Sequence, residues 1–467
     1  MKILLVILLV CAALPTAATS FYVDPANGSD GGDGSAAHPW RSLQTVLDTG
    51  LVESRDWPSY PYVPGTPLVP INPGAPVKAG DTLWLRSGYY GDVVVTHLYN
   101  SAPITIAAQP GHTPRLRSLQ VQSAQSWVLR GLSISSSYGA VNAQIDLVDI
   151  SNHNWSGPTW DIELADSAIF SIADASAWGA DEWINLASNG VTVGGERISV
   201  HDNTIRNVRF GISVDGADAS IRHNLIDGFS ADGLRGLGDR GLFEYNRVQN
   251  VKVSDSEGDG NHDDGFQSWS VGTGGVGTGE VTGVILRGNL FINSTDPNDP
   301  LRNSMQGIGC FDGFFTGWIV ENNVVITDHW HGISFYGMRD SRIVNNTVLD
   351  INATSPGPPW IMVHAHKDGR HSSNVVVRNN LATDYSLDAD SLVADHNLEF
   401  AMADAATLFV APPYDVHLRP DSAAIDAGSA QLAPPMDIDG VPRPQGGAWD
   451  LGAYEWRDGI FADGFEP

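Results

Sequence analysis

The sequence is poor in cysteine, in lysine and in long hydrophobic runs. Its 2 cysteines are Cys11, inside the N-terminal apolar run, and Cys310. A mature chain without that run keeps one cysteine, which excludes an internal disulfide, so the hydrophobic core must hold the fold. After Lys2 the lysines are Lys78, Lys252 and Lys367. No stretch beyond the N-terminal run is apolar enough for a membrane helix, and we therefore expect no membrane span.

Positive charge is also scarce. The chain has 26 basic and 54 acidic residues, and its net charge is −28 with histidine neutral. Nucleic acids are bound through basic patches, so this composition argues against a nucleic-acid partner. An acidic surface also repels a polyanionic substrate unless cations or a local basic cluster intervene. We expect a soluble monomer.

The first 20 residues predict a secretory signal peptide. Lys2 supplies the positive start, and residues 3–15 form an apolar run that is too short for a membrane span. Small residues at positions 18 and 20 place the cleavage before Phe21. Lipoprotein cleavage at Cys11 is the alternative, but the residues before this cysteine fit a lipid-attachment motif poorly. We therefore expect the protein to be secreted, either to the periplasm or outside the cell.

An internal repeat determines the expected fold. Asparagine followed by two mostly apolar residues recurs, and the short spacings are 21 to 23 residues. A unit of this size holds three short strands and three turns, and it buries its apolar face only by stacking on its neighbours. The repeated asparagine fits a turn and predicts an asparagine ladder along the stack. Its members are Asn203, Asn224, Asn246, Asn289, Asn323, Asn346 and Asn380.

A second motif, mostly glycine followed by an apolar residue, marks one strand of each unit. Side chains of a strand alternate between its two faces. We expect the apolar residues to point into the core, and the residues three positions later to lie on the outer face. The expected core residues are Ile212, Leu234, Phe266, Ile308, Ile333 and Ile361, and the expected outer residues are Asp215, Leu237, Trp269, Phe311, Tyr336 and His364.

These patterns predict an all-β protein, a right-handed parallel β-helix over residues 21–455. The segment from 21 to about 50 reads as an entry strand and a short helix that caps the open end of the stack. Residues 456–467 read as an acidic tail. The strand Gly80–Arg86 and the strand at 103–108 resemble the N-terminal part of secreted polysaccharide lyases of the alginate lyase and chondroitinase B type. Residues 424–455 are similar to the closing segment of bacterial β-helix surface proteins. The resemblance implies the fold and a glycan-directed activity.

The acidic group around residue 264 is the strongest local feature. Asp263 and Asp264 open a strand, and Asp232 occupies the matching position one coil earlier. Equivalent positions of adjacent coils lie about 4.8 Å apart, so we expect these carboxylates to cluster. They could bind Ca²⁺ together with His262. Asp232 and Asp264 could instead be the acid and base of a glycosidase. Acids that merely begin turns before glycine are the alternative.

An outer column of rings next to these acids suits sugar stacking. We expect Trp269, Phe311 and His364 to bind substrate, with Arg235 and Gln267 placing its polar groups. An insertion loop folded over the column is the alternative.

The basic run 364–370 suggests a third chemistry. Lys367 and Arg370 could neutralise a uronate carboxylate, and Lys367, Tyr336 or His331 could remove the C5 proton. In the alginate lyase group a lysine and an arginine fill these roles one or two coils apart. Here the two residues are three positions apart, so the family's roles do not transfer residue by residue.

Four functions remain open. Our first hypothesis is a polysaccharide lyase that cleaves a uronate-containing glycan by β-elimination. Ca²⁺ is the cofactor that such a lyase could use. A glycoside hydrolase of the polygalacturonase type would use Asp232 and Asp264, with His331 later in the chain. A C5-epimerase begins with the same proton removal as a lyase. A non-catalytic glycan-binding surface protein needs only the repeat and the two ends.

Overall fold

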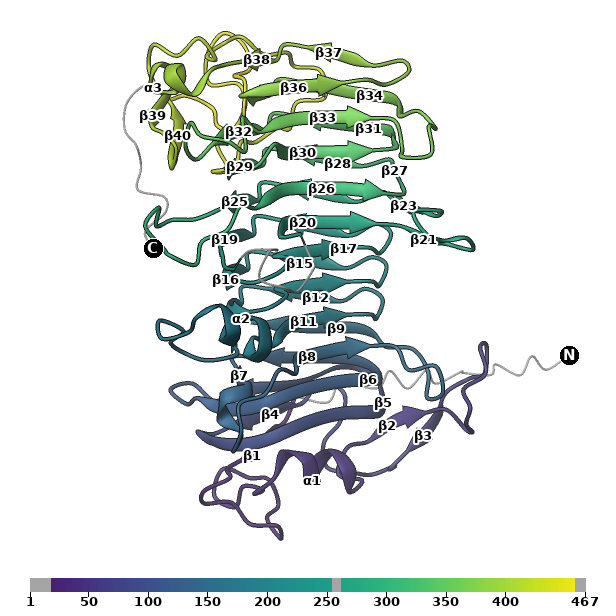
Figure 1. Cartoon of the computed structure of the whole chain (residues 1–467). Coiled ribbons are helices and arrows are strands. Elements are labelled where there is room, and N and C mark those ends of the chain that lie inside the picture. Colours follow the sequence, from purple (N-terminus) through teal and green to yellow (C-terminus); the bar gives the residue numbers. More distant parts are fainter. Residues whose placement is uncertain (1–17, 254–261, 458–467) are drawn as a thin grey trace, which may run out of the picture.

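The computed structural model describes residues 18–253 and 262–457, which form a right-handed parallel β-helix (Figure 1). Nearly all of the predicted signal peptide and tail, and the acidic loop 254–261, lie outside the described residues. The chain rises coil by coil from the N-terminal end at the bottom of Figure 1 to the C-terminal end at the top.

Each coil contributes strands to three stacks, and strands of neighbouring coils pair in parallel. The first stack carries the glycine-marked strands. Its strands are β8 (Asp146–Ser151), β11 (Asn189–Val193), β14 (Ile212–Val214), β17 (Leu234–Gly236), β20 (Asp264–Trp269), β26 (Gln306–Asp312), β30 (His331–Tyr336), β33 (Trp360–His364) and β36 (Asp384–Leu387).

The second and third stacks complete the coils. The second consists of β9 (Trp160–Ala165), β12 (Ser199–His201), β15 (Ser220–Arg222), β18 (Leu242–Glu244), β24 (Ile285–Arg287), β28 (Ile319–Glu321), β31 (Met338–Val344), β34 (Ser373–Arg378) and β37 (Val393–Asp395). The third consists of β7 (Ser133–Ser135), β10 (Ala168–Phe170), β13 (Thr204–Val208), β16 (Leu225–Phe229), β19 (Arg247–Val251), β25 (Leu290–Ile292), β29 (Val324–Thr327), β32 (Thr347–Asp350), β35 (Leu381–Ala382) and β38 (Leu398–Glu399).

The expected asparagine ladder is confirmed. Each ladder asparagine is buried, and its Nδ2 donates to the Oδ1 of the next at 3.0 Å, from Asn203 up to Asn380. Asn397 extends the ladder by one more step. The residue before each asparagine has φ between 50° and 63°, so a left-handed turn aims the amide along the stack.

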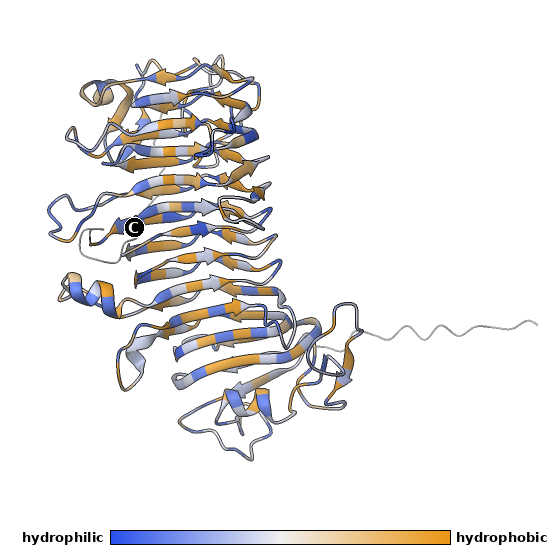
Figure 2. Ribbon diagram, turned by 45° about the vertical axis from the view of Figure 1, so that its right-hand side comes forward, coloured by the Kyte–Doolittle hydropathy of each residue, from blue (hydrophilic) through white to orange (hydrophobic). Residues whose placement is uncertain are grey.

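The core lies between the three stacks, and the predicted inward residues are confirmed. Ile212, Leu234, Phe266, Ile308, Ile333 and Ile361 are all at most 1 % exposed. Figure 2 shows the apolar and polar residues alternating along the strands. Edge-to-face rings fill the middle of the core, where Trp318 contacts Phe266, Phe315 and Phe335 at 5.4 to 6.2 Å between centroids.

The N-terminal end is closed by the short helix α1 (Leu43–Asp48), as expected. Ser42 caps it by accepting from the Thr45 N–H at 3.2 Å, and Leu43, Val46 and Leu47 pack into the core. Figure 1 places α1 below β1 (Ser20–Val23), at the open end of the stack. In the residues that the structure describes, no helix combines the length and apolarity needed to cross a membrane.

The C-terminal segment packs on the flank of the upper coils, outside the third stack. Leu408, Phe409 and Tyr454 join a second hydrophobic cluster with strand residues such as Ile326 and Leu381. This segment includes α3 (Ala405–Leu408), β39 (Phe409–Ala411) and β40 (Asp415–Leu418).

A buried ion pair fixes the end of this segment. Arg443 Nη1 donates to Glu455 Oε2 at 2.7 Å. Asn345 Nδ2 donates to the Asp450 carbonyl at 3.1 Å, which ties the segment to a turn of the β-helix.

Candidate active site

The outer face of the first stack has two chemically different edges. Asp232, Asp264, Gln306, His331 and Trp360 lie at or just before the starts of successive strands, and we call this side the strand-start edge. The other side, the strand-end edge, carries Trp269, Phe311, Tyr336 and His364.

Asp232 and Asp264 form a buried carboxyl pair at the strand-start edge. The Asp264 N–H donates to Asp232 Oδ1 at 3.1 Å, and Arg235 Nε donates to Asp232 Oδ2. Gln267 Nε2 donates to Asp264 Oδ2 at 2.9 Å. Burial raises the pKa of Asp264 well above its usual range, and the neighbouring Asp232 raises it further. Both carboxyl groups are fully buried, but Asp232 is bonded to an arginine whereas Asp264 is bonded to a neutral amide.

A glycine makes room for the Asp264 carboxyl. A Cβ at Gly309 would lie 2.2 Å from Asp264 Oδ1 and 3.2 Å from Gln306 Oε1. Both oxygens are buried, and neither has a hydrogen-bond partner among residues 18–253 and 262–457. A protonated Asp264 would supply a donor between these two acceptors.

The residues expected to hold Ca²⁺ diverge. Asp263 accepts from Asn303 Nδ2, whereas Asp264 faces Gln267 and lies 3.9 Å from His262 Nδ1. Within residues 18–253 and 262–457 no group of three or more His, Cys, Asp or Glu is arranged to hold a metal ion. The two carboxyl groups accept from the amides of different residues, Asn303 and Gln267, and we derive no step through calcium.

Arg235 is held between two rings. Its guanidinium lies 3.8 Å from the Phe210 centroid and 5.2 Å from the Trp269 centroid, while Nε is bonded to Asp232. This arrangement fixes the Trp269 ring on the face beside the acid pair.

Two histidines form the upper part of the strand-start edge. His331 stacks on His329 with centroids 5.3 Å apart, and Trp360 Nε1 donates to His331 Nδ1 at 3.2 Å. Burial, helped by the charges of neighbouring histidines, lowers the pKa of each histidine to about 4. Both rings are therefore neutral near pH 7. Ser334 Oγ lies 3.0 Å from the same Nδ1 and 3.2 Å from Trp360 Nε1, so the imidazole, the hydroxyl and the indole form one hydrogen-bonded group.

The strand-end edge carries the predicted column of rings. Phe311 and Tyr336 have centroids 5.6 Å apart, and Tyr336 and His364 are 6.4 Å apart on paired strands. All three side chains are half-buried, so one side of the column remains open. His364 Nε2 is within 2.9 Å of Ser386 Oγ, which fixes its ring.

Basic residues gather in the turns that follow this edge. Lys367 Nζ donates to Asp312 Oδ1 at 2.7 Å, so this side chain reaches back across the coil that ends in Tyr336. Arg370 pairs with Asp368 and lies 4.0 Å from the Phe314 centroid, and Arg339 lies 3.6 Å from the same centroid. We call Arg339 and Arg370, which pack on Phe314, together with Lys367, which reaches Asp312, the basic cluster.

The packing of Arg339 and Arg370 on Phe314 was not predicted from the sequence. The sequence does contain one indication that Arg339 lies near Lys367. Arg339 follows Tyr336 by three residues, just as Lys367 follows His364. The packing of both arginines on Phe314 depends on the turn conformations, which the repeat does not specify.

The structure divides the expected lyase residues between the two edges. Tyr336, Lys367 and Arg370 lie at the strand-end edge, whereas His331 begins the strand that Tyr336 ends. The Phe311 ring contacts both His331, at 4.8 Å, and Tyr336. The expected hydrolase pair, Asp232 and Asp264, does come together.

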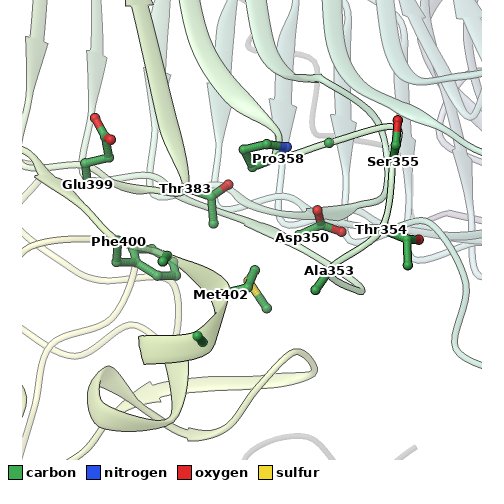
Figure 3. Close-up of a pocket in the computed structure, with 12 residues that line it drawn as sticks. Asp350, Ala353, Thr354, Ser355, Pro358, Thr383, Glu399, Phe400 and Met402 are labelled. Carbon is green, nitrogen blue, oxygen red and sulfur yellow. The ribbon is translucent and has the colours of Figure 1, made fainter.

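A cavity of about 430 Å³ lies away from this face, between the third stack and the C-terminal segment (Figure 3). Asp350, Thr383, Phe400 and Met402 line it. Burial raises the pKa of Asp350 to about 6. None of the residues expected at the active site lines this cavity.

No protein-family model and no curated protein matches the sequence. Several solved structures are similar in shape. Pectate lyase Pel9A has a TM-score of 0.49 and 14 % identity, over 94 % of this chain and 96 % of that one. A rhamnogalacturonan lyase has a TM-score of 0.40 and 13 % identity, over 85 % and 91 %. The catalytic unit of a GH87 alpha-1,3-glucanase from Streptomyces thermodiastaticus has 0.38 and 11 %, over 69 % and 64 %.

Proposed function

We propose that this protein is a secreted polysaccharide lyase that cleaves a uronate-containing glycan by β-elimination at the strand-end edge. Arg339 carries the proposal. Within the described residues its guanidinium stacks on Phe314 and makes no ion pair, although the chain has a net charge of −28. A guanidinium is suited to bind a carboxylate through two parallel hydrogen bonds, and here it adjoins an open column of rings.

The chemistry requires a held carboxylate and two proton transfers. Elimination removes the C5 proton of the uronate, and that electron pair forms the C4–C5 double bond. The C4–oxygen bond breaks, and the leaving oxygen takes the electron pair and a proton. We assign the carboxylate to Arg339 and the proton transfers to Tyr336 and Lys367, one deprotonated as the base and the other protonated as the acid. Arg370 adds positive charge at the same ring.

The test is product chemistry with the full exported chain on alginate, pectate, glycosaminoglycans and neutral glycans, with and without chelator. We expect the ultraviolet absorbance of an unsaturated uronate on at least one acidic polymer. Tyr336→Phe should lower this rate by about 100-fold or more, because it removes a proton-transfer group. Tyr89→Phe, an exposed tyrosine in the N-terminal coils, is the matched control.

Other products would contradict the proposed lyase activity. New reducing ends without the absorbance would favour a hydrolase, and C5 hydrogen exchange without cleavage would favour an epimerase. Loss of activity with chelator would support a calcium site. Binding without any product would favour a non-catalytic glycan-binding protein. Export is tested separately, by N-terminal sequencing of the mature protein, which we expect to begin at Phe21.

A glycoside hydrolase is the second candidate, favoured by the raised pKa of Asp264 beside Asp232. Such a pair suits a proton donor and an ionised partner. Asp264 is fully buried, however, and its Oδ1 is out of contact with solvent. Arg339 and Tyr336 lie at the more open edge, which is why we rank the lyase first.

A further inference from the structure

The rings at the strand-start edge form a surface that the proposed cleavage chemistry does not use. Trp330 is 43 % exposed. Its ring packs edge-on against His329 at 5.8 Å, His329 stacks on His331, and His331 contacts Trp360 at 5.4 Å. An exposed indole on a fixed base of rings is suited to stack on the apolar face of a sugar.

Hydrogen bonds fix the polar atoms of this surface. His329 Nδ1 accepts from the His331 N–H at 3.0 Å, and His331 Nδ1 accepts from Trp360 Nε1 at 3.2 Å. The neutral His329 ring is thereby left with its Nε2–H as a donor, and Ser334 Oγ, 3.0 Å from His331 Nδ1, adds a hydroxyl to the same group. Neutral donors suit hydroxyl or carbonyl oxygens of a sugar.

The charges around the surface disfavour an anion. The described carboxyl groups closest in sequence and register are Asp328, which precedes His329, and Asp384, which pairs with Trp360 in the next coil. Asp264 lies two coils below His331. Asp328 is paired with Arg302 at 3.0 Å, so that arginine is already engaged by a carboxylate. A uronate here would face carboxyl groups and neutral imidazoles, whereas Arg339 at the other edge makes no ion pair within the described residues.

We propose that the surface formed by His329, Trp330, His331 and Trp360 is a subsite for an uncharged sugar, so that the substrate joins uronate to neutral residues. Phe311 connects the two edges, since its ring contacts His331 on one side and Tyr336 on the other. A glycan with its uronate at Arg339 would thus place a neighbouring sugar on this surface. The inference rests on the proposed function for the position of the uronate.

Affinity electrophoresis in gels containing polysaccharide tests the subsite independently of cleavage. The probes are two alternating polymers, hyaluronan and the rhamnogalacturonan backbone, and two homopolymers of uronate, polygalacturonate and polyguluronate. The proteins are the full chain, Trp330→Ala, and the control Trp155→Ala, whose tryptophan is 58 % exposed on a loop of the lower coils. Melting curves confirm that each variant is folded.

We expect the full chain to be retarded more strongly by at least one alternating polymer than by either homopolymer. Trp330→Ala should weaken that retardation by about three- to tenfold, as expected for loss of one ring contact, and Trp155→Ala should not. If Trp330→Ala leaves the retardation by both alternating polymers unchanged, or lowers it equally on homopolymers, the inference is wrong. Retardation that depends on Trp330 without elimination products would overturn only the lyase. Elimination with binding that is independent of Trp330 would overturn only the subsite.

Discussion

Asp264 is a single carboxyl group whose ionisation opposes folding. Its pKa is raised in the folded state by burial and by Asp232, so its contribution to stability is full below the unfolded pKa, near 3.8, and is lost as pH rises through the folded pKa. Asp264→Asn removes the ionisation, and its amide can donate to Gln306 Oε1, which has no partner in the described part of the chain. We expect this variant to be more stable at pH 8 by about 1–3 kcal/mol, with a smaller gain at pH 4.

Urea unfolding of Asp264→Asn and the parent at pH 4, 6 and 8 measures this difference. The same variant separates the two candidate reactions. A hydrolase that uses Asp264 as its acid would lose activity, whereas elimination at the strand-end edge would continue. Equal destabilisation of the variant at all three pH values would show that Asp264 is ionised without penalty.

His329 and His331 respond to pH in the opposite sense. Their folded pKa values, about 4, lie below the unfolded value near 6.5, so the unfolded chain takes up protons first. Stability is therefore full above pH 6.5 and falls as pH drops toward 4, by up to about 3 kcal/mol for each ring. The double variant His329→Gln, His331→Gln should lose less stability between pH 7 and 4. His38→Gln, at an exposed histidine, is the control, and an unchanged acid loss in the double variant would contradict the prediction.

Among the structural elements, the asparagine ladder was predictable because a repeated residue in a stacked repeat must meet its own copies. Asn289 shows what each step contributes. Its Nδ2 donates to Asn323 Oδ1 and to the Phe243 carbonyl, at 3.0 and 2.9 Å, and its Oδ1 accepts from the Asn246 backbone and side chain. Asn289→Ala leaves several of these buried groups without partners.

We expect Asn289→Ala to lower the free energy of unfolding by about 3 kcal/mol or more, since each unsatisfied buried group costs about 1–3 kcal/mol. Asn298→Ala, at an exposed asparagine whose side chain makes no hydrogen bond in the described part of the chain, should change it by less than about 0.5 kcal/mol. Urea unfolding followed by tryptophan fluorescence compares the two. Similar midpoints for both variants would mean that the ladder adds little to stability.

The strands of the first stack show where prediction from sequence stops. Alternation along a strand correctly placed Phe266 inside and Tyr336 outside. A bulge between Ser268 and Trp269 then sets Trp269 opposite Asp312 instead of Phe311, and the sequence did not predict this shift. Contacts between turns, such as Arg339 on Phe314, were equally unpredictable, because turn conformations vary from coil to coil while strand pairing repeats.

On the scale of the whole molecule, net charge and local charge act in opposite directions. The chain carries −28, while Arg339, Lys367 and Arg370 gather at one edge. A polyanionic glycan is therefore repelled at long range and attracted at contact. The long-range part is screened first, because the Debye length shrinks from about 30 Å at 0.01 M salt to about 10 Å at 0.1 M.

This opposition predicts an unusual salt dependence. We expect KM for an acidic polymer to fall by about two- to tenfold between 0.01 and 0.1 M NaCl, as repulsion between protein and substrate is screened. Above about 0.5 M it should rise again, when the contacts of the basic cluster are screened as well. Arg339→Gln should remove the rise at high salt and keep the fall at low salt, because it alters the cluster but hardly changes the net charge. Steady-state rates across this range of salt measure both the fall and the rise in KM. A KM that increases from the lowest salt onward would mean that attraction by the basic cluster outweighs the long-range repulsion at every salt concentration.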